Sequence, residues 1–367
     1  MTQYCVELEP IEDYFFGNER SFGFGRDNKA IYNNYFITSE NLPTQTTLLG
    51  MMRYFVLKRN NLLNKDFSSL SLSDNELKRQ EELIGSGFRF DGEFDCGVIK
   101  EISPMFLKNR DDEILIKAPF NGKISDNKLE LRKLKADNSE IKLIDGNLEK
   151  DFKLIEGIRL KEEDNIRNSY VILNESRKVI KNEDIFNAHI KVGINRFLEK
   201  DGFFKKEYKS LKDYKLCFYV TFDETKFKLS DNKRITDIVY MGMGKSAFKF
   251  TMYKEINYLE DKIKSIMKAD NMFYYALSDL ACKDTKKLNE CCDLIFLETR
   301  NFRCLKTNYQ EKSFYNKLKQ SGLYNLIRAG SVFFVNDVKK YEFEQLFEND
   351  NLKKAGFNHI IKIGGND

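Results

Sequence analysis

The stretch that most constrains the fold is residues 239–250, with the sequence VYMGMGKSAFKF. An apolar run leads into Gly242, Gly244, Lys245 and Ser246, and apolar residues then alternate with polar ones. Alternation with a period of two predicts a strand, so we expect two strands joined by a glycine-rich loop. Glycines let a backbone lie close to a phosphate, and a lysine adds positive charge. A tight hairpin that needs only positive φ angles has the same composition, so both interpretations remain open.

The same stretch ends like the P-loop of nucleotide hydrolases, with Gly244, Lys245 and Ser246. A P-loop also needs a glycine five residues before Gly244, and that position is Val239. A P-loop leads into a helix, whereas the residues that follow here have the pattern of a strand. We therefore expect no nucleotide hydrolysis at this loop.

Charge is distributed unevenly along the chain, although the formal net charge is only +4. Residues 1–98 carry 10 Lys and Arg residues against 15 Asp and Glu residues. Residues 200–270 carry 16 Lys and Arg residues against 11 Asp and Glu residues. This distribution predicts a positive field around the glycine-rich stretch, which suits a polyanionic partner; a solvated lysine-rich face is the alternative.

The seven cysteines are odd in number and form no CxxC pair, and the chain has no secretory signal pattern. We therefore expect reduced thiols and a cytoplasmic protein. With His189 and His359 as the only histidines, a structural zinc site is not expected. We expect no metal or cofactor, and no apolar run approaches the roughly 20 residues that span a bilayer.

The residue pattern predicts strands and helices that do not alternate regularly. A strand at residues 2–9 precedes a short strand at 32–38 and a helix that starts after Thr44. The other expected helices lie at residues 73–84, 256–267, 310–318 and 341–347, and the other strands at residues 97–107, 113–119, 128–135, 140–144, 215–222, 292–298, 329–335 and 359–363. The charged residues 161–185 are interpreted as surface helix and loop. A basic hairpin is expected over residues 189–208, where a lysine-guarded edge strand is the structural alternative to a phosphate-binding ribbon.

These elements predict an α+β fold with two ferredoxin-like (RRM-like, split βαβ) units, a basic β-hairpin insertion and the glycine-rich loop. The expected domains are residues 1–210, with the hairpin, and residues 211–367, with the loop. No group of carboxylates or metal ligands predicts a hydrolytic centre. A metal-independent RNA-cleaving site would need a histidine near a tyrosine or lysine, and only His189 on the basic hairpin could serve.

Several segments together resemble the RAMP superfamily of CRISPR proteins, and most closely the subunit of the type III-B (Cmr) effector complex that caps the 5′ end of the guide RNA. Each segment is degenerate, but they follow the family order along nearly the whole chain. The segments are residues 9–17 with 20–22, 42–53, 102–107 with 114–119, 192–194 with 202–204, 241–250, 328–332 and 355–358. Residues 161–185 match no part of the family pattern.

The resemblance implies a non-catalytic subunit that holds the repeat-derived 5′ tag of the guide RNA. It implies contacts with a large polymerase/cyclase-like subunit and with the first backbone RAMP subunit, and only indirect contact with target RNA. The residues that it implies as RNA ligands are Gly242, Gly244, Lys245 and Ser246 in the loop, Thr44, Gln45, Thr46, Thr47 and Arg53 on the helix, His189, Lys191 and Arg196 on the hairpin, and Phe16 and Tyr35 as stacking rings. For Arg53 a salt bridge is the alternative, and for His189, Lys191 and Arg196 a contact with the backbone subunit.

Two alternatives to this function stay open. One is a metal-independent endoribonuclease of the same superfamily that processes guide RNA precursors, with His189 as its base. The other is a protein scaffold without RNA contact, which the basic residues 200–270 disfavour.

Overall fold

The computed structural model describes residues 1–17, 36–63, 73–137, 140–145, 148–152, 166–195, 202–227, 229, 234–242, 245–307 and 318–365. Most of the strand expected at residues 32–38 lies outside these ranges. So does the helix expected at residues 310–318, apart from Leu318, which begins strand β24 (Leu318–Gln320).

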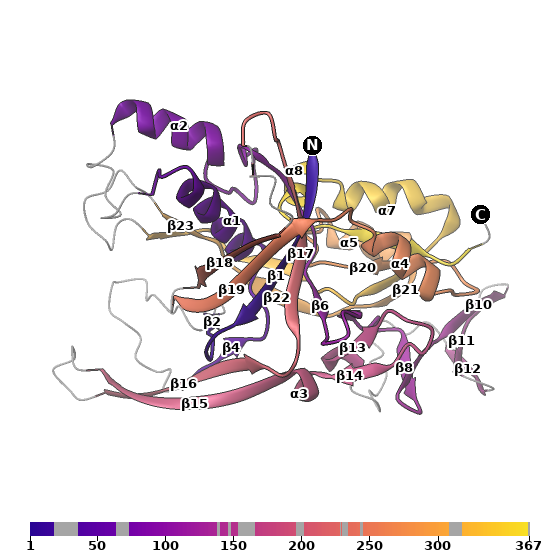
Figure 1. Ribbon diagram of the computed structural model, residues 1–367. Coiled ribbons are helices and arrows are strands. Elements are labelled where there is room, and N and C mark those ends of the chain that lie inside the picture. The colour runs from indigo at the N-terminus through magenta and orange to yellow at the C-terminus, as the bar shows by residue number, and fades with distance from the viewer. Residues whose placement is uncertain are drawn as a thin grey trace.

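One antiparallel sheet of nine strands forms the centre of the described chain (Figure 1). In its middle, β1 (Thr2–Pro10) pairs with β17 (Lys215–Phe222) on one side and with β19 (Ser246–Lys254) on the other. The other strands are β5 (Ile99–Ile102), β6 (Phe106–Lys108), β7 (Ile114–Lys117), β13 (Ser169–Ile172), β14 (Val179–Lys181) and β18 (Arg234–Met241). The domain boundary expected at residue 210 stays a prediction; it would fall between β1 and the two strands that pair with it, β17 and β19.

Strands β13 and β14 correct the interpretation of residues 161–185 as surface helix and loop. β13 pairs with β7 inside the sheet, and its residues are buried. Charged residues on both sides of this region flank a short apolar run from Tyr170 to Leu173. That run is long enough for one buried strand.

Helix α1 (Gln45–Arg59), whose start after Thr44 the sequence predicts, covers one face of this sheet. The hydroxyl of Thr44 caps the helix by accepting from the backbone N–H of Thr47 at 3.4 Å. Its apolar side is buried, and the ring of Phe55 lies 4.8 Å from that of Phe250 in β19. The predicted second helix is α2 (Asp74–Ile84), which begins with a capping box.

A second sheet of four strands lies against the other face of the nine-stranded sheet. Its order is β21 (Cys292–Phe296), β26 (Val332–Val335), β20 (Phe273–Ala276) and β27 (Ile360–Ile363), and all pairs are antiparallel. Buried rings such as Tyr219 from the first sheet and Tyr275 and Phe334 from the second share the core between them. Helices α5 (Thr285–Cys291) and α7 (Lys340–Phe347) cover the outer face around Phe333 and Phe343. The layers are therefore helix, sheet, sheet and helix.

The remaining elements connect or decorate these layers. They are β2 (Phe16–Gly17), β3 (Phe36–Ile37), β4 (Ser39–Glu40), β8 (Gly122–Ser125), β9 (Lys128–Leu131), β10 (Lys133–Asp137), β11 (Glu140–Asp145), β12 (Leu148–Phe152), η3 (Ile166–Asn168), α3 (Asn182–Ile185), α4 (Leu259–Ile266), β22 (Thr299–Phe302), β23 (Leu305–Thr307), β25 (Tyr324–Ile327), η4 (Asp337–Lys339) and α8 (Asp350–Lys354).

The predicted basic hairpin is a long ribbon of two strands, β15 (Phe186–Asn195) and β16 (Gly202–Leu211), which pair over their whole length. The ribbon runs along one edge of the molecule, below β2 and β4 in the view of Figure 1. Backbone hydrogen bonds of 2.8 Å in both directions between Tyr14 and Lys209 attach the base of the ribbon to the segment that follows β1.

A network of charged groups surrounds the buried carboxylate of Glu7 in the middle of the central sheet. The carboxylate of Glu7 in β1 lies 3.3 Å from the Nζ of Lys108 and 3.1 Å from that of Lys215. The hydroxyl of Tyr253 donates to it at 2.7 Å, and Arg234 lies 3.6 Å away. The side chains of Glu7 and Lys108 are only 3% and 5% exposed, so their charges depend on one another rather than on water.

All seven cysteines are described and none forms a disulfide bond. Among the helices in the described ranges, none has both the length and the apolar character needed to cross a membrane.

Candidate nucleic-acid interface

The glycine-rich stretch is the turn between β18 and β19. Gly242 has a φ of +71°, and its carbonyl accepts a hydrogen bond of 3.1 Å from the backbone N–H of Lys245. Lys245 itself has a φ of +50°, and its side chain is exposed. β19 follows directly, so the stretch continues as a strand, as predicted, and not as the helix of a P-loop. Gly244 lies outside the described residues.

The turn is fixed to the segment between β1 and β2. Ser246 is buried, and its hydroxyl accepts a hydrogen bond of 3.1 Å from the backbone N–H of Phe15. A Cβ at Gly242 would lie 2.8 Å from the carbonyl oxygen of Phe15, so only glycine fits there without a shift. Ser246 therefore holds the turn in place, and the exposed Lys245 precedes it in the chain.

One face of the ribbon places lysines over aromatic rings. The Nζ of Lys206 lies 3.8 Å from the ring centre of Phe15 and 4.9 Å from that of Tyr208. The Nζ of Lys191, on β15, lies 4.5 Å from the ring of Tyr208, on β16. Ammonium groups at these distances are attracted by the rings and are held in defined positions. The ribbon thus presents ordered positive charge beside Phe15, the residue to which the glycine turn is also fixed.

Asp13 partly neutralises this face. Its carboxylate lies 3.1 Å from the Nζ of Lys191 and 3.9 Å from the Nε2 of His189. The same Nε2 lies 3.1 Å from the hydroxyl of Ser210. In a catalytic triad the carboxylate and the hydroxyl meet opposite nitrogens of the imidazole, whereas here both lie at Nε2. The three residues therefore do not have the arrangement of a triad.

The hydroxyls at the start of α1 are occupied with one another. The Oγ1 of Thr44 lies 3.0 Å from the hydroxyls of both Thr46 and Thr47. The Oε1 of Gln45 is buried and lies where a Cβ at Gly356 would come within 2.6 Å. Gln45 therefore packs toward the residues that follow α8, while the half-buried threonines lie at the helix start.

Two of the expected RNA ligands, Arg53 and Phe16, have partners within the fold. The Nη2 of Arg53 donates to the backbone carbonyls of Ser86 and Asp95 at 2.6 and 3.0 Å, so it ties residues 86–95 to α1. Phe16 is 4% exposed, and its ring is stacked on that of Phe248 at 5.9 Å. The ring of Phe16 belongs to the core in this structure, and its stacking on a base stays a prediction that would require it to leave this packing.

Tyr35 and Arg196 lie outside the described residues. Among those described, the structure brings Gly242, Lys245 and Ser246 together with His189 and Lys191 through the segment at residues 13–16. The threonines at the start of α1 are connected to that segment less directly. β4 pairs with β2, and the residues after β4 lead into α1.

Sequence reasoning missed Asp13, Phe15 and Tyr208 in this surface. The alternation of β16 places Lys206 and Tyr208 on one face, and that signal was available. Which of two adjacent rings, Phe15 or Phe16, would contact the ribbon depends on strand pairing that the sequence does not reveal.

Within the described ranges, no cluster of three or more His, Cys, Asp or Glu side chains could hold a metal ion.

Comparison with known proteins finds chains of similar structure, among them chains of two cryo-EM structures. A chain of the cryo-EM structure of type III-B Cmr-beta bound to cognate target RNA and AMPPnP is 14% identical, with a TM-score of 0.44, and the match covers 98% of each chain. A chain of type III-B Cmr-beta bound to cognate target RNA is 10% identical, with a TM-score of 0.28, and the match covers 68% of this chain and 96% of the other. No family model and no curated protein matches the sequence.

Proposed function

We propose that this chain is a non-catalytic RNA-binding subunit of a type III-B CRISPR effector complex, and that it holds the 5′ repeat-derived tag of the guide RNA. The sequence support is the family order of its motifs from end to end. The observation that carries the proposal is that the glycine turn and the lysine-bearing ribbon are both fixed to residues 13–16.

This arrangement suits a single RNA strand. Lys245 and Lys206 offer charge to phosphates along one surface, and the packing of Gly242 against the Phe15 backbone fixes the turn that carries Lys245. A subunit with this role would bridge the large polymerase/cyclase-like subunit to the first backbone RAMP subunit, and would meet target RNA only indirectly.

The fold proposed for this role contains two ferredoxin-like units. The second sheet supports this assignment, because its elements follow the order β20, α5, β21, β26, α7 and β27, with β26 between β20 and β21 and with β20 between β26 and β27. In the first sheet, β1 lies between β17 and β19 and is followed by α1, which matches part of such a unit; the element described between β17 and β19 is β18, where the second helix of the unit would lie.

The test measures binding of a guide RNA with and without its 5′ segment as a function of salt concentration. The guide RNA is the small RNA that co-purifies with the complex. For a single strand, the slope of log K against log salt changes by about 0.7 for each phosphate contact. We expect Lys245→Ala and Lys206→Ala each to weaken binding and to reduce the slope by about that amount. Lys286→Ala in α5 is the matched control, because Lys286 is exposed on the opposite layer.

Two results would contradict the proposal. Unchanged binding and unchanged protection of the 5′ segment in Lys245→Ala would remove the turn from the site. Specific cleavage of repeat RNA by the purified protein in EDTA, abolished by His189→Ala, would favour the processing endoribonuclease over the non-catalytic subunit.

A further inference from the structure

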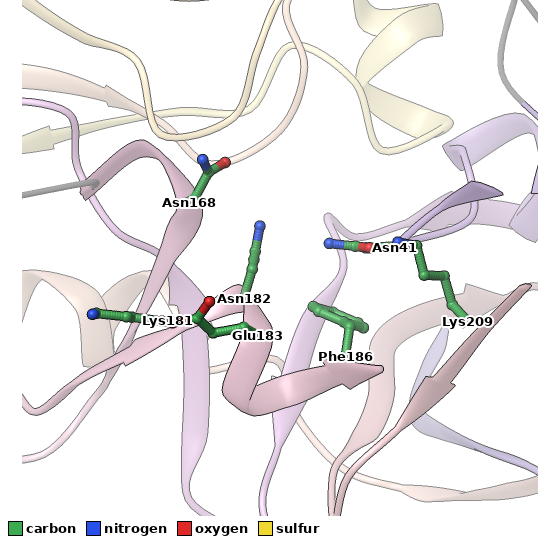
Figure 2. A pocket seen from close by; sticks show the side chains of 7 residues that line it. All are labelled: Asn41, Asn168, Lys181, Asn182, Glu183, Phe186 and Lys209. Carbon is green, nitrogen blue, oxygen red and sulfur yellow. The ribbon is translucent and has the colours of Figure 1, made fainter. Parts of the chain in front are cut away.

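A polar cavity of about 390 Å³ opens at the base of the ribbon (Figure 2). Its lining comes from the link after β4, from η3, from the junction of β14 and α3, and from both strands of the ribbon. The lining residues are Asn41, Asn168, Lys181, Asn182, Glu183, Phe186 and Lys209. This volume is within the range of pockets that hold small organic ligands.

Three carboxamides and one aromatic ring define the interior. Figure 2 shows the amides of Asn168 and Asn182 on one side, the amide of Asn41 across the opening, and the ring of Phe186 between them. The Oδ1 of Asn182 is buried and has no hydrogen-bond partner among the described residues. Because this oxygen is buried, a ligand in the cavity does not reach it, and Figure 2 shows the amide nitrogen of Asn182 at the cavity side as the group that can donate to a ligand.

The charges at the cavity are compensated. The Nζ of Lys209 lies 2.6 Å from the carboxylate of Glu207, and Glu183 lines the opening beside the exposed Lys181. Because each lysine lies beside a carboxylate, a simple anion such as free phosphate would gain little electrostatic attraction in the cavity. The amides can both donate and accept hydrogen bonds, and the ring of Phe186 offers a flat apolar surface. A neutral, planar ligand with several hydrogen-bonding groups matches both features, and nucleobases have this chemistry.

The cavity adjoins the surface of the proposed function. Lys209 forms its backbone hydrogen bonds with Tyr14, which precedes the Phe15 that lies under Lys206. The hydroxyl of Tyr14 also donates to the carbonyl of Asn41 at 2.9 Å. A strand that follows the ribbon therefore passes the mouth of the cavity. We propose that the cavity takes one unstacked nucleobase of a single-stranded RNA, an inference that rests on the proposed function.

The experiment compares intact RNA with RNAs that lack one base at a time. A fluorescent single strand of about twelve nucleotides, within the usual range of single-strand sites, is scanned with abasic positions in a binding assay. We expect one position at which loss of the base weakens binding by about tenfold, which is typical of one stacked base. In Asn182→Leu, which keeps the side-chain size but removes the amide, binding of the intact RNA should fall about tenfold and the penalty at that position should disappear.

Two further variants guard the interpretation. Asn41→Leu acts from the opposite wall and should give the same result if Asn182→Leu is poorly folded. Asn325→Leu is the matched control, since Asn325 is exposed on β25 and should retain the full abasic penalty. The four nucleoside monophosphates, titrated separately, test a free nucleotide as the other source of a base.

Each outcome decides between the inferences. RNA binding without a sensitive position, or a penalty that persists in both cavity variants, refutes the base pocket and leaves the proposed function standing. Monophosphates that bind at the cavity while the RNA does not bind at all refute both. An abasic penalty that both variants remove and the control keeps supports the pocket.

Discussion

The buried carboxylate of Glu7 should contribute far more to stability than an exposed carboxylate on the same strand. At 3.3 Å and an effective dielectric constant of about 20, its attraction to Lys108 is about 5 kcal/mol before the cost of desolvation. Removing one partner leaves the other charge buried, which typically costs about 3–5 kcal/mol. We therefore expect Glu7→Gln to lower the free energy of unfolding by about 3 kcal/mol or more, since the glutamine keeps the size but not the charge.

Glu9 provides the matched control. It lies two residues further along β1, so it points to the same side of the strand, and its carboxylate lies 3.1 Å from the Nζ of Lys249. That pair is 37% and 52% exposed, and exposed pairs contribute about 0–1 kcal/mol. Urea unfolding at pH 7 measures both variants. Equal losses for Glu7→Gln and Glu9→Gln would refute the argument from burial.

The pH dependence gives a second measurement on Glu7. Burial raises the pKa of its carboxyl, but the hydrogen bonds from Tyr253 and Lys215 and the charge of Lys108 outweigh burial and hold the pKa below its ordinary value of 4.5. Because the folded-state pKa is the lower one, this stabilisation is present above pH 4.5 and is lost as the pH falls through the folded-state value. The acid limb of the stability curve should be shallower in Glu7→Gln.

Three further substitutions test the interface and its supports by urea unfolding. Gly242→Ala should cost about 1–2 kcal/mol because it places a Cβ at a φ of +71° and against Phe15, whereas Gly322→Ala, with no atom near its Cβ position, should change little. Thr44→Ala should cost about 1 kcal/mol through loss of the helix cap, and Thr44→Ser should restore it. Phe16→Ala should lower the free energy of unfolding by about 3–5 kcal/mol because it truncates a core residue. A much smaller loss would show that the ring is not part of the core.

Local patterns predicted most of the elements. The alternation of apolar and polar residues predicted β1, β19 and the ribbon, and Thr44 before an apolar helical face predicted the start of α1. These features depend on neighbours within a few residues, so a single sequence contains them. The short strand β13 was missed because charged residues surround its apolar run.

The candidate site could be predicted only in part. Lys245 and the ribbon lysines follow from composition and turn chemistry, but the facing of Phe16 depends on Phe248, with which it stacks across the fold. The sequence alone left an RNA contact and a salt bridge open for Arg53. In the structure its guanidinium donates hydrogen bonds to the backbone carbonyls of Ser86 and Asp95, which no local pattern predicts. The cavity could not be found from sequence, because its walls come from segments that no local pattern connects.

The central position of β1 has a consequence for synthesis on the ribosome. Glu7 is separated from its partners Lys215 and Tyr253 by 208 and 246 residues, so β1 is made long before either neighbouring strand. At about 5–20 residues per second, both of its edges stay without their native partners for roughly ten seconds or more. An unpaired strand edge invites pairing with other chains. We therefore expect the nascent chain to depend on chaperones that shield this strand until β17 and β19 emerge.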